Sequence, residues 1–444
     1  MSKQAPPLES VSVPAVSAAT VQSGQANRVL ILSTVAFTLL FAVWLMFGVL
    51  GVPIKEEFHL TKIQFSWLTA IAVLSGSIWR LPLGIWADRV GGRVLMTGLL
   101  LATAIPCFLV SRATSYTGLL VCAFLFGVAG NSFSVGIAWN ATWAERHRQG
   151  FALGTFGAGN VGASVTKLIG PLLIAAVPGA LWAGVIPGGW RFVPVLYTAL
   201  LVIMAAIVWF GAPNPDRTPG SGRTIAAMLR PLSTVRIWRF GLYYVVVFGA
   251  YVALSLWLPN YYKNVYGLTL SKAALLTAGF IFPASLLRPV GGWLSDKFGP
   301  RPVTYVVFLA MLLACVPLSI ARSAGIKLGP GMFFVLVEVL GIGMGIGKAS
   351  VYKYIPEYFP KDVGAVGGLV GTLGALGGFF LPLAFGYLDS ATGRPESCFW
   401  VMFGLVLLSL MWLHMVVLDI NRRARRSVSD AGKSVNMPGT ARAI

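Results

Sequence analysis

Twelve apolar segments, each about as long as a helix that crosses a bilayer, constrain the fold of this chain more than any other feature. A helix needs roughly 20 apolar residues to span the hydrocarbon core. Apolar side chains make up 57% of the chain and charged ones 11%, a balance too apolar for a water-soluble protein of this length. We therefore predict an all-α integral membrane protein. The segments lie at approximately 30–52, 64–87, 94–112, 117–140, 151–177, 190–211, 238–263, 271–296, 302–322, 331–355, 363–388 and 398–420.

The longest polar stretch inside the chain divides these segments six and six. This stretch, 212–237, is rich in proline and glycine, which is typical of a linker. We predict an N-terminal six-helix half at 28–211 and a C-terminal six-helix half at 238–421. Residues 1–27 are too polar for a signal peptide and are predicted to form a disordered tail. Residues 422–444 are predicted to form a basic tail.

The net charge of +20 would suggest a nucleic-acid partner in a soluble protein. Here most of the basic residues lie in the two tails and in the loops on the side of the membrane that holds both termini. The positive-inside rule makes that side cytoplasmic. We therefore predict a multi-pass protein of a bacterial cytoplasmic membrane, with both termini inside. Its basic character then reflects the bilayer, and no nucleic-acid partner is expected.

Two related loops indicate that the halves repeat each other. GIWADRVGGR at 84–93 follows the second span, and GWLSDKFGPR at 292–301 follows the eighth. Each loop sets an acid among glycines and basic residues, which suits a gate that must form and break. An arginine also lies eight residues before the acid in both copies. The predicted gate residues are Asp88, Arg89, Arg93, Asp296, Lys297 and Arg301.

The two arginines, Arg80 and Arg288, fall inside the second and eighth spans. An ionised side chain there costs roughly 3 kcal/mol, and arginine does not neutralise itself by losing its proton. About 12 Å of helix separates each arginine from the end of its span, so reaching the membrane surface would strain the side chain. The simplest partner is an anionic substrate, which a guanidinium group binds through paired hydrogen bonds.

The repeated loop resembles the signature of the major facilitator superfamily, G-x-x-x-D-(R/K)-x-G-x-(R/K). This resemblance covers the whole chain, because it also implies twelve helices in two pseudo-symmetric halves and a central linker. In such a fold the two halves rock around a site at the middle of the membrane.

Two glycine-rich segments carry the resemblance further. They read GTFGAGNVG at 154–162 and GAVGGLVGTLGALGG at 364–378, and such small residues also allow helices to pack closely. The pair resembles the signature motifs of nitrate/nitrite porters, the NarK-like branch of the superfamily. In that family two arginines clamp the anion and aromatic rings enclose it. The resemblance implies substrate binding by Arg80, Arg288, Phe133, Phe248, Tyr244 and Asn160.

Lysines and one acid inside the spans are predicted to take part in proton coupling: Lys167, Lys348 and Glu338. An anion that enters against an inside-negative potential costs about 2.3 kcal/mol per 100 mV. Either protons accompany it or another anion leaves in exchange. A lysine buried beside fixed positive charges can release its proton. Lys167 departs from the exchanger-like pattern of the family, and Lys348 together with Lys353 resembles its proton-symporter branch. We predict nitrate import with proton symport, and nitrate/nitrite exchange is the alternative.

Other functions stay open from the sequence alone. A facilitator for another small anion, such as a dicarboxylate or a phosphorylated sugar, would share the buried arginines, and a transporter-like nitrate sensor would share the whole site. The chain has no nucleophile motif, P-loop or metal-binding cluster, so we predict neither an enzyme nor a cofactor. Since one chain already encloses a two-half cavity, we predict a monomer.

Overall fold

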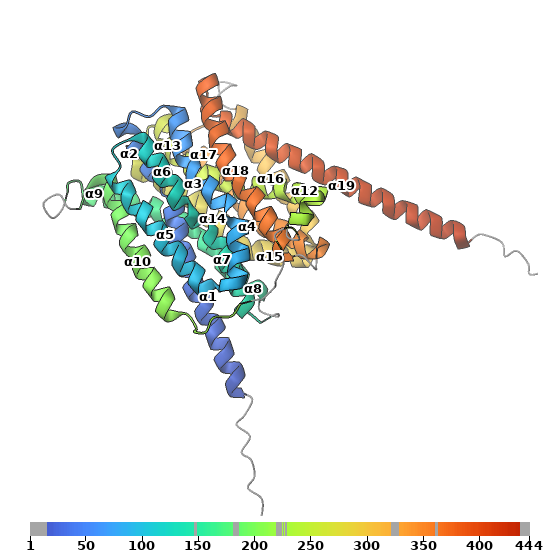
Figure 1. Cartoon of the computed structure of the whole chain (residues 1–444). Helices are drawn as coiled ribbons and strands as arrows, with labels where there is room; N and C mark the ends of the chain where they lie inside the picture. Colours follow the sequence, from blue (N-terminus) through green and yellow to red (C-terminus); the bar gives the residue numbers. More distant parts are fainter. Residues whose placement is uncertain are drawn as a thin grey trace, which may run out of the picture.

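A computed structural model describes residues 16–145, 149–180, 186–218, 224, 226, 229–320, 328–359 and 363–435. Within these residues, twelve helical segments are long and apolar enough to cross a membrane, which confirms the predicted all-α fold with twelve spans. The end of the molecule at which α1 begins, at the bottom of Figure 1, is called the terminus-bearing end below, and α19 extends outwards from the bundle in the same view.

The first half contains six spans, several of which are built from two consecutive helices. Its helices are α1 (Val16–Trp44), α2 (Phe47–Glu57), α3 (Lys62–Ile78), α4 (Arg80–Val90), α5 (Gly92–Arg112), α6 (Tyr116–Phe126), α7 (Ser132–Trp143), α8 (Gln149–Ala158), α9 (Gly162–Ala176) and α10 (Phe192–Gly211). The second half repeats this plan. Its helices are α12 (Val235–Tyr244), α13 (Ala250–Tyr266), α14 (Leu270–Leu286), α15 (Arg288–Phe298), α16 (Pro300–Ile320), α17 (Pro330–Tyr358), α18 (Val363–Thr392) and α19 (Ser397–Val435).

Both ends of the chain are more helical than the sequence suggested. The helix α1 begins at Val16, so the prediction of disorder is wrong for residues 16–27. The helix α19 continues to Val435, through the first part of the predicted basic tail. Residues 15–27 and 422–437 contain no proline that would stop a helix, so each helix continues beyond its membrane segment. Residues 1–15 and 436–444 lie outside the described part of the chain.

Several spans lose regular α-helical geometry in their interior. The first span is interrupted between α1 and α2, the second at Trp79 and the eighth at Leu287. The fourth and fifth spans contain 3₁₀ turns at Gly127–Asn131 and Gly159–Val161, and the seventh contains a π turn at Val245–Gly249. Such turns are frequent at functional sites, because they redirect side chains and release backbone groups for other partners.

Glycine allows the close approach of helices at these turns. A Cβ atom added to Gly162 would lie only 2.0 Å from the carbonyl oxygen of Thr38 on α1. The helices α1 and α9 contact each other here, so only a residue without a side chain fits. This is the close packing that the glycine-rich fifth segment predicted.

We expect Gly162→Ala to destabilise the protein by about 1–3 kcal/mol, because its methyl group would collide with backbone that cannot move aside. Gly154→Ala is the matched control, since no atom lies within 4 Å of its added Cβ. Thermal denaturation of the two purified variants in detergent measures the difference. Equal midpoint temperatures would contradict this account of the packing.

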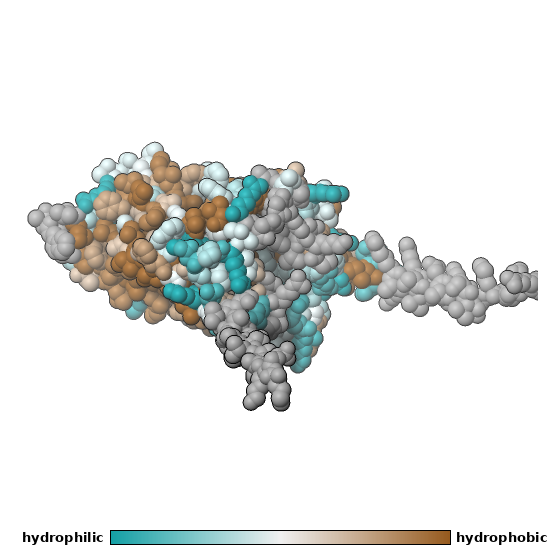
Figure 2. Space-filling model, turned by 60° about the horizontal axis from the view of Figure 1, so that its bottom comes forward, coloured by the Kyte–Doolittle hydropathy of each residue, from teal (hydrophilic) through white to brown (hydrophobic). Residues whose placement is uncertain are grey.

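The outer surface divides into an apolar flank and a polar end. Large apolar side chains are exposed around the spans, including Ile105, Phe210 and Val306 at 68%, 81% and 68%, as expected for a surface that faces lipid. Figure 2 brings the terminus-bearing end forward and shows hydrophilic residues there, beside the hydrophobic flank. The exposed basic residues of this end include Arg28, Arg89, Arg230, Arg236 and Lys297.

The two halves meet at the opposite end through a set of polar contacts that we call the outer barrier. It consists of the ion pair between Lys62 and Asp389 at 2.9 Å, the ion pair between Glu56 and Lys263, and the hydrogen bond from Trp67 to Tyr387 at 3.3 Å. Every contact joins a residue of the first half to one of the second. The helices α3 and α18 also pack against each other, as do α9 and α14. The halves are therefore held together on the side away from the termini.

Candidate anion-binding site

Arg80 is the first residue of α4 and follows directly on the interruption at Trp79. Its side chain is 1% exposed. The Nε atom donates to the Gly76 carbonyl at 2.9 Å, and Nη1 reaches the Gly371 carbonyl of the other half at 3.4 Å. Nη2 has no hydrogen-bond partner within the described residues. Two carbonyl groups thus orient the guanidinium and leave one of its amino groups free for a ligand.

Arg288 occupies the equivalent position in the second half, as the first residue of α15. It is 8% exposed, and its Nη1 atom has no hydrogen-bond partner in the part of the chain that the structure describes. A Cβ atom added to Gly157 of α8 would lie 3.1 Å from this Nη1. A glycine at this position therefore lets the first half approach the arginine of the second.

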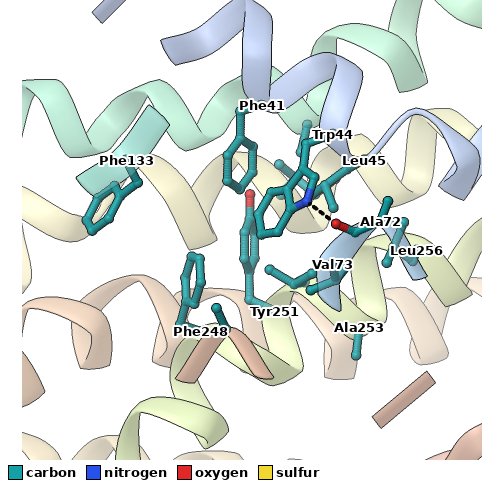
Figure 3. Close-up of a cluster of buried hydrophobic side chains, with 14 of the residues drawn as sticks. Phe41, Trp44, Leu45, Ala72, Val73, Phe133, Phe248, Tyr251, Ala253 and Leu256 are labelled. Atoms are coloured by element: carbon teal, nitrogen blue, oxygen red, sulfur yellow. Dashed lines mark hydrogen bonds between the residues drawn. The ribbon is translucent and has the colours of Figure 1, made fainter. Parts of the chain in front are cut away.

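Aromatic rings bring the two arginines to one place. The Cζ atoms of Arg80 and Arg288 lie 5.6 and 5.3 Å from the centre of the same ring, that of Phe133 on α7. Arg80 also lies 5.3 Å from the ring of Phe248, which stacks on Tyr244 with a centroid distance of 5.1 Å. Figure 3 shows Phe133 and Phe248 on separate elements of this apolar region. Of the predicted residues, these five therefore share one site.

The site contains buried hydrogen-bond donors without partners among the described residues. Besides Arg80 and Arg288, the Tyr244 hydroxyl lacks a partner among these residues. Asn160, on the 3₁₀ turn of the fifth span, is also buried with neither its Nδ2 donor nor its Oδ1 acceptor paired in the described part of the chain. Leaving a buried polar group unpaired costs about 1–3 kcal/mol, and folded proteins rarely leave several together. A small ligand with several acceptor oxygens would satisfy these donors and would balance the charge of the two arginines.

Two aromatic residues of the site were not predicted from the sequence. The ring of Trp44 lies 5.6 Å from the Cζ atom of Arg80, and the ring of Tyr352 lies 5.6 Å from that of Arg288. Trp44 ends α1 at the interruption of the first span and donates to the Ala72 carbonyl at 2.9 Å, the dashed line in Figure 3. Tryptophans and tyrosines are common in these spans, so nothing in the sequence distinguishes these two.

The three residues predicted to couple protons lie in different places. Lys348 is fully buried beside the site: its Nζ donates to the Ala284 carbonyl at 2.8 Å and lies 5.8 Å from the ring of Phe248. Lys167 instead donates to the Leu45 carbonyl at 3.2 Å, at the interruption of the first span. The Oε1 atom of Glu338 is buried without a partner among the described residues. Ten residues of α17, about 15 Å of helix, separate Glu338 from Lys348.

The predicted gate residues form contacts within their own halves. Asp296 pairs with Lys353, and Arg301 donates to the hydroxyl of Tyr358. The Nζ atom of Lys297 lies 5.4 Å from the ring of Trp293. In the first loop Arg89 is exposed, and the side chain of Asp88 lies outside the described part of the structure.

An acid of the linker, which was not predicted as a gate residue, holds the first of these loops. The carboxylate of Asp216 accepts hydrogen bonds from the Arg93 backbone at 2.8 Å and from the indoles of Trp139 and Trp143 at 3.0 and 2.9 Å. Asp216 is the only acid in the stretch 212–237, and this is the signal that could have identified it. The start of the linker is therefore attached to the first half.

Twelve apolar spans in two halves around a buried basic site define a multi-pass membrane transporter rather than an enzyme. The sequence pattern of the Major Facilitator Superfamily matches residues 32–326 and 271–439. The chain is 60% identical to a "Probable nitrate/nitrite antiporter NarK1" of Thermus thermophilus, over 88% of this chain and 92% of that protein. It is 32% identical to a "Nitrite extrusion protein" of Bacillus subtilis (strain 168), over 84% of this chain and 91% of that protein. The chain therefore belongs to the nitrate/nitrite porter (NarK-like) family of the major facilitator superfamily.

A solved structure supports the fold independently. The bacterial homologue of the human lysosomal transporter Spinster, in an inward-facing and occupied conformation, matches with a TM-score of 0.69. The match covers 88% of this chain and 96% of that one, at 18% sequence identity. Such a match concerns the arrangement of the helices and not the substrate. The family and the fold implied by the sequence motifs are both confirmed.

Proposed function

We propose that this chain imports nitrate, with nitrite as a second substrate, by alternating access across a bacterial cytoplasmic membrane. The observation that carries this proposal is the group of unpaired buried donors around Arg80 and Arg288. Relatives of the chain carry names of nitrate or nitrite transport. The positive-inside rule supports placing both termini in the cytoplasm. The chain encloses the whole site by itself, so we propose that it acts as a monomer.

Nitrate fits the chemistry of these donors. It is a flat monovalent anion with three acceptor oxygens, so two guanidinium groups can bind its edge. The rings of Phe133 and Phe248 exclude water and strengthen the charge contacts. Nitrite offers a similar edge with one oxygen fewer, so its affinity should differ only modestly. A bulky organic anion would need more room than glycine-packed helices leave.

Alternating access follows from the contacts between the halves. The outer barrier closes the site on the side away from the termini, through Lys62–Asp389 and Glu56–Lys263. These contacts must break when the halves rock to admit an anion from that side. The anion then replaces the missing partners of the arginines, which lowers the cost of holding both positive charges within the membrane.

For the driving force we propose proton symport, with Lys348 carrying the proton. This lysine lies beside the anion site, and no carboxylate pairs with it within the described residues. Unlike arginine, lysine can change its charge during a transport cycle. Two or more protons per nitrate would be needed for the membrane potential to favour entry.

Exchange of nitrate for nitrite is the second candidate. It is favoured by the name of the 60% identical relative, which is called an antiporter. It also agrees with a substrate clamp of two arginines, neither of which titrates.

Uptake by the purified protein in liposomes separates the two mechanisms. We expect an inward proton gradient to drive nitrate uptake into vesicles that contain no nitrite, because the proton adds positive charge to the moving complex. Uptake that needs internal nitrite and ignores the gradient would establish exchange. A protein that moves neither anion under either condition would refute nitrate transport itself. Empty liposomes and liposomes with Arg288→Lys provide the controls.

A further inference from the structure

Tyr251 joins the two halves directly beside the anion site. It lies on α13, one turn after Phe248 and farther from the terminus-bearing end, and it is fully buried. Its hydroxyl donates to the backbone carbonyl of Asn160 at 3.1 Å. Asn160 belongs to the first half and Tyr251 to the second. Figure 3 shows the hydroxyl of Tyr251 directed away from Phe248, towards Phe41 and Trp44 of α1.

The hydrogen bonds of this hydroxyl have a fixed direction. A phenol has one proton, and the carbonyl of Asn160 can only accept. Ser285, whose Oγ lies 3.1 Å from the same hydroxyl, must therefore donate to it. The result is a chain from Ser285 through Tyr251 to Asn160, in which each bond strengthens the next.

The side-chain amine of Lys348 contacts the ring of Tyr251. The Nζ atom of this lysine lies 3.2 Å from the centre of the ring, the position of a strong cation–π contact. The charge of Arg288 on α15 also acts on Lys348. A cation on the ring draws electrons from the phenol oxygen, so the hydroxyl becomes a better hydrogen-bond donor to Asn160.

We propose that Tyr251 is the positioning residue that links the charge of Lys348 to the closure of the outer barrier. Its hydrogen bond to Asn160 joins the two halves one helical turn from Phe248 of the anion site. When Lys348 is charged, the bond is strong and the halves stay together on that side. When Lys348 loses its charge, the bond weakens and the barrier opens more readily. This inference rests on the proposed transport function and assigns the coupling to a residue outside the anion clamp.

The test measures opening of the outer barrier with a thiol probe in the full-length protein in detergent. Ser255→Cys places the thiol where α13 meets Gly48 of the first half, and the native cysteines Cys107, Cys122, Cys315 and Cys398 are all buried. In this background we expect Tyr251→Phe to accelerate maleimide labelling of Cys at this position about tenfold, the effect of losing one hydrogen bond. Tyr243→Phe is the matched control, because its buried hydroxyl has no partner among the described residues. Its labelling rate should stay within about twofold of the parent.

A double-mutant cycle tests the link to Lys348. Lys348→Met should also accelerate labelling, and combining it with Tyr251→Phe should add no further acceleration, because both changes remove the same effect. If Tyr251→Phe labels at the parental rate, or if the two effects multiply, the proposal is wrong. If Tyr251→Phe fails to fold, Ser285→Ala takes its place. This variant removes the donor to the Tyr251 hydroxyl, so we expect a smaller acceleration of labelling. A labelling rate equal to that of the parent would refute the chain of hydrogen bonds. Nitrate binding to the parent protein, measured by calorimetry on the same sample, separates failure of the proposed function from failure of this inference.

Discussion

Arg80→Lys should reduce nitrate uptake by at least about 100-fold, the loss expected when two hydrogen bonds to a charged ligand disappear. The guanidinium of Arg80 holds two carbonyl groups, of Gly76 and Gly371, and still offers Nη2 to a ligand. An ammonium group is a single compact donor centre and cannot occupy these three directions at once. Lysine keeps the positive charge but loses the planar arrangement of donors, so the variant tests the paired hydrogen bonds of the guanidinium rather than its charge.

Arg288→Lys should have an effect of the same size, because the two arginines converge on Phe133 from opposite halves. Initial rates of labelled nitrate uptake into liposomes measure both variants, with the amount of folded protein checked by gel filtration. Arg230→Lys is the matched control, since Arg230 is exposed at the terminus-bearing end. Uptake within about threefold of the parent in either site variant would remove that arginine from the proposed clamp.

The sequence predicted the spans and the arginine pair because each depends on a cost that is local to the chain. An apolar run of about 20 residues has few stable locations besides the bilayer, so the twelve segments could be identified one by one. Arg80 and Arg288 are conspicuous for the opposite reason, since a charge within such a run needs an explanation. The repeat around Asp88 and Asp296 then showed that these two arginines are equivalent.

The contacts between the halves could not be predicted in this way. The ion pair between Lys62 and Asp389 joins residues 327 positions apart, and either residue alone reads as an ordinary charge at the end of a span. The bond from Tyr251 to Asn160 depends on the 3₁₀ turn at Gly159–Val161, which a pattern of small residues does not specify. Asparagine at this position was predicted from the family motif, but its tyrosine partner was not.

The proton-coupling residues show the same limit. The sequence placed Lys167, Lys348 and Glu338 within the membrane, but it did not show which of them lies beside the buried arginines. In the structure only Lys348 reaches the aromatic rings of the site, at 5.8 Å from Phe248 and 3.2 Å from Tyr251. Lys167 supports the interruption of the first span through the Leu45 carbonyl. Distances between spans, which set these roles, come from packing and not from position in the chain.

Lys348→Gln should separate nitrate binding from its driving force. Glutamine keeps most of the length of the side chain and a donor for the Ala284 carbonyl, but it cannot carry a charge. If Lys348 carries the coupled proton, uptake driven by a proton gradient should fall at least about tenfold, which corresponds to about 1.4 kcal/mol of lost coupling. Exchange of internal nitrite for external nitrate should continue, because Arg80 and Arg288 are untouched.

Lys167→Gln is the matched comparison, because Lys167 is equally buried but contacts the first span instead of the anion site. The Lys167→Gln variant should retain gradient-driven uptake, and any fall in its rate should match a fall in the amount of folded protein. Both variants are measured in liposomes with and without a proton gradient and with and without internal nitrite. Loss of gradient-driven uptake in Lys167→Gln but not in Lys348→Gln would identify Lys167, on the fifth span, as the proton carrier. If neither lysine variant loses gradient-driven uptake, Glu338 is the remaining candidate for the proton carrier, since its buried Oε1 atom lacks a partner among the described residues. If Glu338→Gln also keeps gradient-driven uptake, the result favours exchange.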